Sequence, residues 1–291
     1  MAANKPNLKG ILAAALAACG FSLSLISAGF AFTAGSDPFT LVAVRGTAGV
    51  VIACIMVRAM ADTYKIAPNV ILPLLLTTAG MLCINYGYMG AIQYIPISLA
   101  TLIFYMFPML VLCVSSVVEQ RMPSLLSCVA FLMAFGGLAS ALGGSLADLD
   151  WRGISLALVA TFGGVMLFFF GAITAKRTNI SLFTLYSQLI IALVGCSVMM
   201  AQGGPNLPSG TVGAFALVGA CVGYLTGISM QFFAVRLINP SLAALIFNVE
   251  PVITITLSAV LLNDILTPGQ YLGGLFVITS VILATRVTTR A

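Results

Sequence analysis

The stretch Ser98-Leu-Ala-Thr-Leu-Ile-Phe104 returns later in the chain as Ser241-Leu-Ala-Ala-Leu-Ile-Phe247, with six of seven residues identical at an offset of 143. The same offset relates further pairs, which are Gly10 and Gly153, Gly20 and Gly163, Gly80 and Gly223, and Pro108 and Pro251. A single offset that holds along both halves indicates an internal duplication. We place the two repeats at residues 1–147 and 148–291.

The composition indicates a protein that lies almost wholly in a membrane. The 291 residues are 61% hydrophobic and only 7% charged, whereas a soluble domain carries about 25% charged residues. The apolar runs match the roughly 20 residues that a helix needs to cross a bilayer. We predict ten such helices, at 8–33, 39–59, 68–92, 97–118, 124–144, 153–174, 181–201, 211–236, 241–262 and 269–287.

Each repeat then holds five spans, and an odd number of spans turns the second repeat upside down relative to the first. We therefore predict an all-α polytopic membrane protein built from two inverted five-helix repeats. This is the arrangement of secondary transporters, in which the substrate site lies near the bilayer midplane between the repeats.

The basic residues predict the orientation. With both termini in the cytoplasm, ten lysines and arginines fall inside and only Arg152 falls outside, in agreement with the positive-inside rule. The expected location is a bacterial inner membrane.

The sequence argues against an enzyme, a metal or cofactor site and nucleic-acid binding. The chain has no histidine, its seven cysteines stand singly within apolar runs, and it has no HExxH, GxSxG or glycine-rich phosphate loop. We therefore expect no enzyme activity, no metal and no cofactor. The net charge of +5 is spread thinly over loops, which argues against nucleic-acid binding.

Polar side chains within spans are expensive in lipid and usually face the interior of a bundle. The fourth predicted helix carries Thr101 and Tyr105 on one stripe, and the ninth carries Asn248 at the position equivalent to Tyr105. Each of these two residues precedes a mid-helix proline, Pro108 or Pro251, which leaves a backbone carbonyl without its helical donor. We predict a kink and a cavity there, with Tyr105 and Asn248 facing each other across the midplane.

Further candidates lie on neighbouring helices. Asn85 and Tyr88 share a face of the third predicted helix, and Gln231 stands at the Tyr88 position of the eighth. These residues complete the predicted substrate-binding set, which is Asn85, Tyr88, Thr101, Tyr105, Gln231, Asn248 and Glu250. We assign structural or gating roles to Arg45, Pro108 and Pro251.

Two ionisable side chains, Arg45 and Glu250, fall within predicted spans. Three roles stay open for Glu250: an ion pair with Arg45 or another donor, uptake of a proton in a coupled cycle, or binding of a cationic substrate group. Small residues at 136, 140 and 144 fit either packing within the chain or a dimer face, and we predict a monomer.

These motifs resemble the EamA-type branch of the drug/metabolite transporter superfamily. The resemblance rests on the two Ser-Leu-Ala-x-Leu-Ile-Phe stretches with their following prolines, on Asp37-Pro38 with Arg45, and on Glu250-Pro251. It implies a ten-helix bundle of two inverted repeats. The chain is also similar to amino-acid exporters of the YddG type, which implies outward movement of aromatic or other neutral amino acids.

Two departures from the pattern of the superfamily bear on the substrate. The Glu-Pro pair occurs only in the second repeat, with Phe107-Pro108 in the first, and the first helix lacks the acidic residue of the small multidrug-resistance branch. The lysines and arginines expected of the sugar-phosphate and nucleotide-sugar branches are also missing from the spans, which argues against an anionic substrate. We expect an exporter of small amphiphilic metabolites, foremost amino acids, that works by alternating access. The alternatives are an efflux pump for hydrophobic drugs and a membrane sensor or scaffold that transports nothing.

Overall fold

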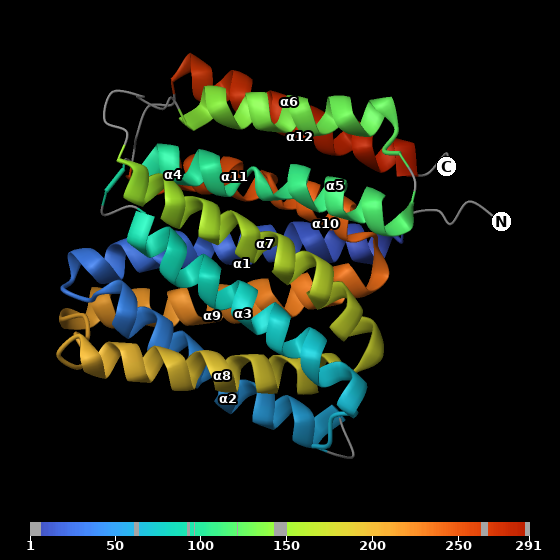
Figure 1. Ribbon diagram of the computed structural model, residues 1–291. Helices are drawn as coiled ribbons and strands as arrows, with labels where there is room; N and C mark the ends of the chain where they lie inside the picture. The colour runs from blue at the N-terminus through green and yellow to red at the C-terminus, as the bar shows by residue number, and fades with distance from the viewer. Residues whose placement is uncertain are drawn as a thin grey trace.

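The structure, a computed structural model, describes residues 7–60, 64–91, 94–95, 97–120, 122–142, 150–262 and 267–288. Within these residues every regular element is a helix (Figure 1). The twelve helices are α1 (Leu8–Thr33), α2 (Pro38–Met60), α3 (Pro68–Ala91), α4 (Ile97–Phe104), α5 (Phe107–Glu119), α6 (Leu125–Leu142), α7 (Trp151–Arg177), α8 (Ile180–Ala201), α9 (Gly210–Leu237), α10 (Pro240–Phe247), α11 (Val249–Leu262) and α12 (Pro268–Thr288).

Among the described residues, eight segments are long and apolar enough to cross a membrane, and two shorter apolar helices lie at Leu125–Ser140 and Pro268–Leu283. The protein is thus a multi-pass helical membrane protein. The fourth and ninth predicted helices are each two helices in the structure, α4 with α5 and α10 with α11. The predicted boundary between residues 147 and 148 lies outside the described residues.

The helix starts follow local sequence rules. The side chain of Asn7 caps α1 by accepting from the backbone N–H of Lys9, and Asp150, at the equivalent position of the second repeat, caps α7 in the same way. Asparagine and aspartate are favoured caps because their oxygens satisfy the free N–H groups of the first turn. Proline is the first residue of α2, α3, α10 and α12, where no helical donor is needed.

The duplication is visible in the helix boundaries. Six helices of the first half have counterparts that start 142 or 143 residues later, namely Leu8 and Trp151, Pro38 and Ile180, Pro68 and Gly210, Ile97 and Pro240, Phe107 and Val249, and Leu125 and Pro268. In Figure 1, α1 starts at the end of the bundle that holds both termini, and α7 starts at the opposite end. The two repeats therefore run in opposite senses.

The repeats do not fold as separate bundles but exchange partners. The most extensive helix contacts join α1 to α9, α3 to α7, α2 to α8, and α6 to α12, and each of these pairs takes one helix from each repeat. Exchanging the repeats converts the α1–α9 pair into the α7–α3 pair, as a pseudo-two-fold axis requires.

Glycines permit the two crossed pairs to approach closely. A Cβ atom on Gly20 would lie 2.8 Å from the carbonyl oxygen of Gly223, and one on Gly163 would lie 2.6 Å from that of Gly80. Both distances are too short for any side chain, so only glycine fits at these crossings. The two contacts are equivalent under the duplication, because Gly20 corresponds to Gly163 and Gly80 to Gly223.

The small residues of α6 divide between two environments. A Cβ on Gly137 would lie 2.7 Å from the carbonyl oxygen of Gly273 on α12, and the Ser140 hydroxyl donates to the carbonyl oxygen of Gly269 at 3.3 Å. A Cβ on Gly136 would meet nothing within 4 Å. The close packing of α6 within the chain thus uses Gly137 and Ser140 rather than Gly136.

At the end of the bundle opposite the termini, the turn after α1 is tied to the loop before α9. The Asn206 amide donates to Asp37 at 2.8 Å, and its backbone N–H donates to the Thr40 hydroxyl at 2.9 Å. The backbone N–H of Ser209 donates to the Ala34 carbonyl at 2.8 Å. Burial raises the pKa of Asp37, but the hydrogen bonds from Thr40 and Asn206 lower it by more in sum, so its pKa lies below the ordinary value.

Candidate functional site: a central cavity

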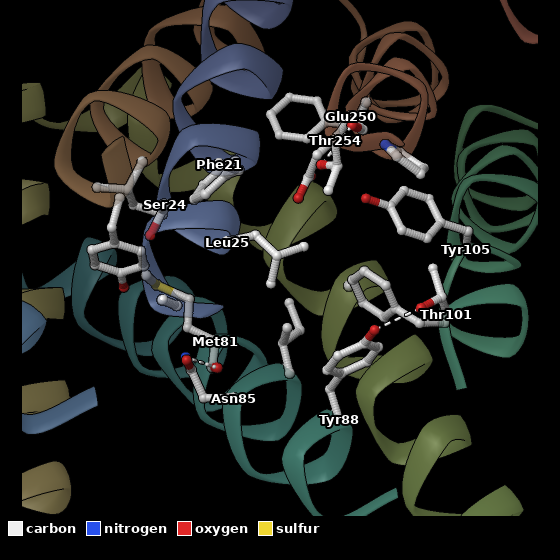
Figure 2. A pocket seen from close by; sticks show the side chains of 18 of the residues that line it. Phe21, Ser24, Leu25, Met81, Asn85, Tyr88, Thr101, Tyr105, Glu250 and Thr254 are labelled. Carbon is white, nitrogen blue, oxygen red and sulfur yellow. Dashed lines mark hydrogen bonds between the residues drawn. The ribbon is translucent and has the colours of Figure 1, made fainter. Parts of the chain in front are cut away.

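A cavity of about 350 Å³ lies between the two repeats and is lined mainly by apolar side chains (Figure 2). Helices of both halves contribute its walls, since α1 to α5 face α7, α9, α10 and α11 across it. Its polar lining residues are Ser24, Arg45, Asn85, Tyr88, Thr101, Tyr105, Tyr224, Gln231, Glu250 and Thr254. This size and this composition are typical of small-molecule sites.

The cavity reaches from the middle of the bundle toward the end opposite the termini. On α1 its lining begins at Phe21 and extends to Phe32, next to the last residue of the helix, and on α3 it extends to Met89. The other end is packed shut. There the rings of Phe183 and Phe232 stack with centroids 3.8 Å apart, and both side chains are fully buried.

Arg45 reaches the cavity from α2. Its Nη1 donates to the Ser24 hydroxyl at 3.4 Å and its Nη2 to the Asn85 side-chain oxygen at 3.3 Å, while its guanidinium carbon lies 4.7 Å from the centre of the Tyr224 ring. All three partners are uncharged. The buried Nε of Arg45 has no partner among the described residues.

Three predicted residues form one wall of the cavity. The Tyr88 and Thr101 hydroxyls are 2.6 Å apart and join α3 to α4, and the Asn85 amide donates to the Met81 carbonyl at 2.8 Å (Figure 2). The Asn85 oxygen is thereby turned toward Arg45. Each of these polar groups has a partner, as is usual for polar groups in a protein interior.

Glu250 lies across the cavity, in the first turn of α11. Its backbone carbonyl accepts from the Ser22 hydroxyl of α1 and from the Thr254 hydroxyl, each at 3.0 Å, which fixes the backbone. The Tyr105 hydroxyl points toward its carboxyl group (Figure 2). Glu250 and Arg45 form no ion pair, because the described side chains contain a single such pair, between Arg152 and Asp150. The ion pair between Glu250 and Arg45, which we considered as one role for Glu250, is therefore not seen in this structure.

The helices beside the cavity are interrupted rather than merely bent. α4 ends at Phe104 and α5 begins at Phe107, just before Pro108, while Asn248 separates α10 from α11, just before Pro251. Hydroxyl groups of the crossed helices bind carbonyls beside both interruptions: that of Thr161 donates to the Ile103 carbonyl at 2.9 Å, and that of Ser22 donates to the Glu250 carbonyl. The carbonyls that the prolines leave without a helical donor are those of Phe104 and Phe247, so these hydroxyls bind the backbone beside the interruptions rather than the freed groups.

Most, but not all, of the predicted site residues line the cavity. Asn85, Tyr88, Thr101, Tyr105, Gln231 and Glu250 line the cavity, together with Arg45 and Pro251. Asn248 and Pro108 are not among the lining residues. Asn248 is only 3% exposed, and its side-chain oxygen has no partner in the described part of the chain. Tyr105 and Asn248 thus do not line the cavity together, contrary to the sequence expectation, because the cavity opens toward one end only.

Comparison with known proteins identifies the family. The model of the EamA-like transporter family matches residues 8–143 and again residues 151–286. The chain belongs to the EamA-like transporter family. Each match covers one repeat, as the duplication requires.

The fold of this EamA-like transporter also occurs among solved structures. One, titled only as the crystal structure of a protein, superposes with a TM-score of 0.82 at 16% identity and covers 97% of this chain and 98% of its own. At this identity the likeness concerns the fold alone. No curated protein matches the sequence.

Two lining residues of this EamA-like transporter were missed from the sequence. Tyr224 lies two turns before Gln231 on the same face of α9, and Thr254 lies one turn after Glu250. The helical spacing of four and seven residues could have found both. Among the described residues, no cluster of three or more metal-ligating side chains occurs.

Proposed function

We propose that this EamA-like transporter is a secondary transporter that exports small amphiphilic metabolites, foremost neutral or aromatic amino acids, from the cytoplasm across an inner membrane. The observation that carries the proposal is the cavity itself. It lies between two inverted repeats, its walls are mainly apolar, and a few polar groups converge at mid-depth. The outward direction rests on the resemblance to YddG-type exporters.

The charge distribution supports termini on the cytoplasmic side. Among the described residues, one end of the bundle holds both chain ends and the basic side chains Lys9, Arg58, Lys65, Lys176, Arg177 and Arg236. The opposite end holds Arg152, which is neutralised by Asp150 at 2.9 Å. In this orientation the cavity opens away from the cytoplasm.

The asymmetry between the repeats supports alternating access. Three residues that line the cavity, Ala28, Phe32 and Leu41, correspond to Gly171, Ala175 and Thr184 at 143 positions later, and none of these three counterparts lines it. Exchanging the conformations of the two repeats would expose the second set at the other end. Asn248, the equivalent of Tyr105, would then enter the path, and this is the role we assign to it.

Within this proposal Asn85, Tyr88, Thr101, Tyr105, Gln231 and Glu250 contact the substrate in the outward-open state. Pro108 and Pro251 keep the two helix interruptions where the repeats move against each other. The protein acts as a monomer, because each repeat completes the walls of the other. The repeats divide at residues 147 and 148.

Transport by purified protein in liposomes tests the function. We expect liposomes preloaded with an unlabelled amino acid to accumulate the labelled one by exchange, foremost with phenylalanine, tyrosine or leucine. Exchange indicates a carrier, since a channel shows no such stimulation. Empty liposomes and liposomes with the Gly20→Leu variant, which cannot form the α1–α9 crossing, provide the baseline. No exchange with any amino acid would reject the proposal.

The apolar walls of the cavity favour one second candidate, an efflux pump for hydrophobic drugs. The same liposomes distinguish the two functions, because a drug pump would move an uncharged lipophilic dye and leave amino acids untouched. A sensor or scaffold would move neither.

A further inference from the structure

The cavity holds two opposite charges that do not neutralise each other. Arg45 comes from the first repeat and Glu250 from the second, and both line the same cavity. No nitrogen of Arg45 lies within 4.0 Å of a carboxylate oxygen of any described residue, and its neighbours Ser24, Asn85 and Tyr224 are all uncharged. An unpaired charge away from bulk water is expensive, so a membrane protein keeps one only where something compensates it.

The two charged residues are held at one depth by the same helix. The guanidinium of Arg45 reaches Ser24, and the backbone of Glu250 is bound by Ser22, so both are anchored within a single turn of α1. Figure 2 shows Ser24 and Glu250 on opposite sides of the cavity, with Leu25 between them. A ligand that lies across the cavity at this depth meets a cation on one side and an anion on the other.

The donors and acceptors beside each charge match the two ends of one ligand. The Arg45 guanidinium has neutral partners only and keeps N–H groups that can bind a carboxylate in a forked pair. The carboxyl of Glu250 can accept from an ammonium group, and the Tyr105 hydroxyl points to the same place. The wall between them is apolar, with Phe21, Leu25 and Phe104 among its side chains.

We propose that the cavity recognises a zwitterion, with the carboxylate of the ligand on Arg45, its ammonium group on Glu250 and its apolar side chain against the wall between them. This inference rests on the proposed function and names the substrate chemistry of the same site. It assigns to Arg45 a direct contact with substrate, in place of the structural role expected from the sequence.

The test compares three labelled compounds that share a phenylethyl group. They are phenylalanine, phenethylamine, which lacks the carboxylate, and 3-phenylpropionate, which lacks the ammonium group. In liposomes the wild-type protein is expected to move phenylalanine at least tenfold faster than either analogue. Glu250→Gln should lower the ratio of phenylalanine to 3-phenylpropionate transport at least tenfold. Arg45→Gln should lower the ratio of phenylalanine to phenethylamine by a similar factor.

Selectivity ratios separate recognition from folding, since a damaged protein loses all three activities together. Arg45→Lys and Glu250→Asp, which keep the charges, should retain part of the wild-type preference. Arg58→Gln, at the far end of α2, is the matched control and should leave every ratio unchanged.

The outcomes distinguish the two proposals. If the wild type moves phenethylamine or 3-phenylpropionate as fast as phenylalanine, or if both charge-removing variants lower all three rates by one factor, zwitterion recognition is wrong while transport stands. If the wild type moves none of the three compounds and no other amino acid, the proposed function itself fails.

Discussion

At the scale of single residues, the central cavity depends on polar groups that are hydrogen-bonded to neighbouring residues. Tyr88 and Thr101 bind each other at 2.6 Å, and Asn85 is bound to Met81 so that its oxygen faces Arg45. Tyr105 is different, because its hydroxyl points to a carboxyl group and not to a fixed backbone partner. A ligand that binds the Glu250 carboxyl group would therefore meet this hydroxyl as well.

Replacing Tyr105 by phenylalanine removes that hydroxyl and keeps the ring against Phe104 and Phe107. One neutral hydrogen bond is worth about 1 kcal/mol, so the concentration of amino acid for half-maximal transport should rise several-fold while expression stays normal. Tyr271→Phe, on the exposed side of α12, is the control. An unchanged half-maximal concentration in Tyr105→Phe, or an equal rise in Tyr271→Phe, would exclude Tyr105 from the site.

At the scale of helices and loops, the repeats are joined by contacts that leave no space for larger residues. α1 crosses α9 at Gly20 and Gly223, and α7 crosses α3 at Gly163 and Gly80. These crossings set the separation of the repeats, and the cavity lies between them. Their geometry is therefore part of the site even though no glycine there carries a functional group.

Alanine at Gly20 would place its Cβ 2.7 Å from the backbone nitrogen of Gly227, which cannot move aside cheaply. Such overpacking costs about 1–3 kcal/mol, and the thermal unfolding temperature in detergent should fall. Gly29→Ala lies on the same helix with nothing within 4 Å of the new Cβ, and alanine favours a helix over glycine by about 1 kcal/mol. Equal midpoints for the two variants would show that the crossing is not close-packed.

The link between the α1–α2 turn and the loop before α9 should depend on pH. The native pKa of Asp37 lies below its ordinary value of 3.8 because Thr40 and Asn206 donate to the charged form. The link therefore stabilises the fold above the ordinary value and is lost as the pH falls through the lower native value. Asp37→Ala should lower the unfolding temperature at neutral pH and match the wild type at about pH 2–3. A difference that persists in acid would mean that charge at Asp37 contributes nothing.

Much of the helix arrangement could be predicted from the sequence, because it follows from local signals. The echo of residues 98–104 at 241–247 indicated the duplication, and proline and asparagine marked the helix starts. The splitting of α4 from α5 was foreseen only as a kink. A proline removes one donor by rule, but this local rule does not decide whether the helix bends or breaks.

At the scale of the whole molecule, two nearly symmetric repeats adopt an asymmetric arrangement. The cavity extends toward one end of the bundle, while stacked Phe183 and Phe232 lie fully buried near the other. This asymmetry is a physical reason why Asn248, which was expected to face Tyr105 across the midplane, does not line the cavity with it. Repeat-equivalent residues are alike in sequence, but in any one state of an inverted-repeat transporter one of them faces the open side and the other the closed side. The sequence carries no signal for which of two equivalent residues faces the open side.

The central claim is that the cavity between the repeats is the path of the substrate, and two leucines of α1 allow a direct test. Leu25 lines the cavity and is 45% exposed, while Leu23 is 44% exposed but does not line it. The decisive measurement is amino-acid exchange into liposomes by Leu25→Trp and Leu23→Trp, each purified to a single monodisperse species. The larger ring at position 25 should fill much of the cavity of about 350 Å³ and lower exchange more than tenfold, with exchange by Leu23→Trp near the wild-type rate. Wild-type exchange by Leu25→Trp, or an equal loss in both variants, would contradict the claim.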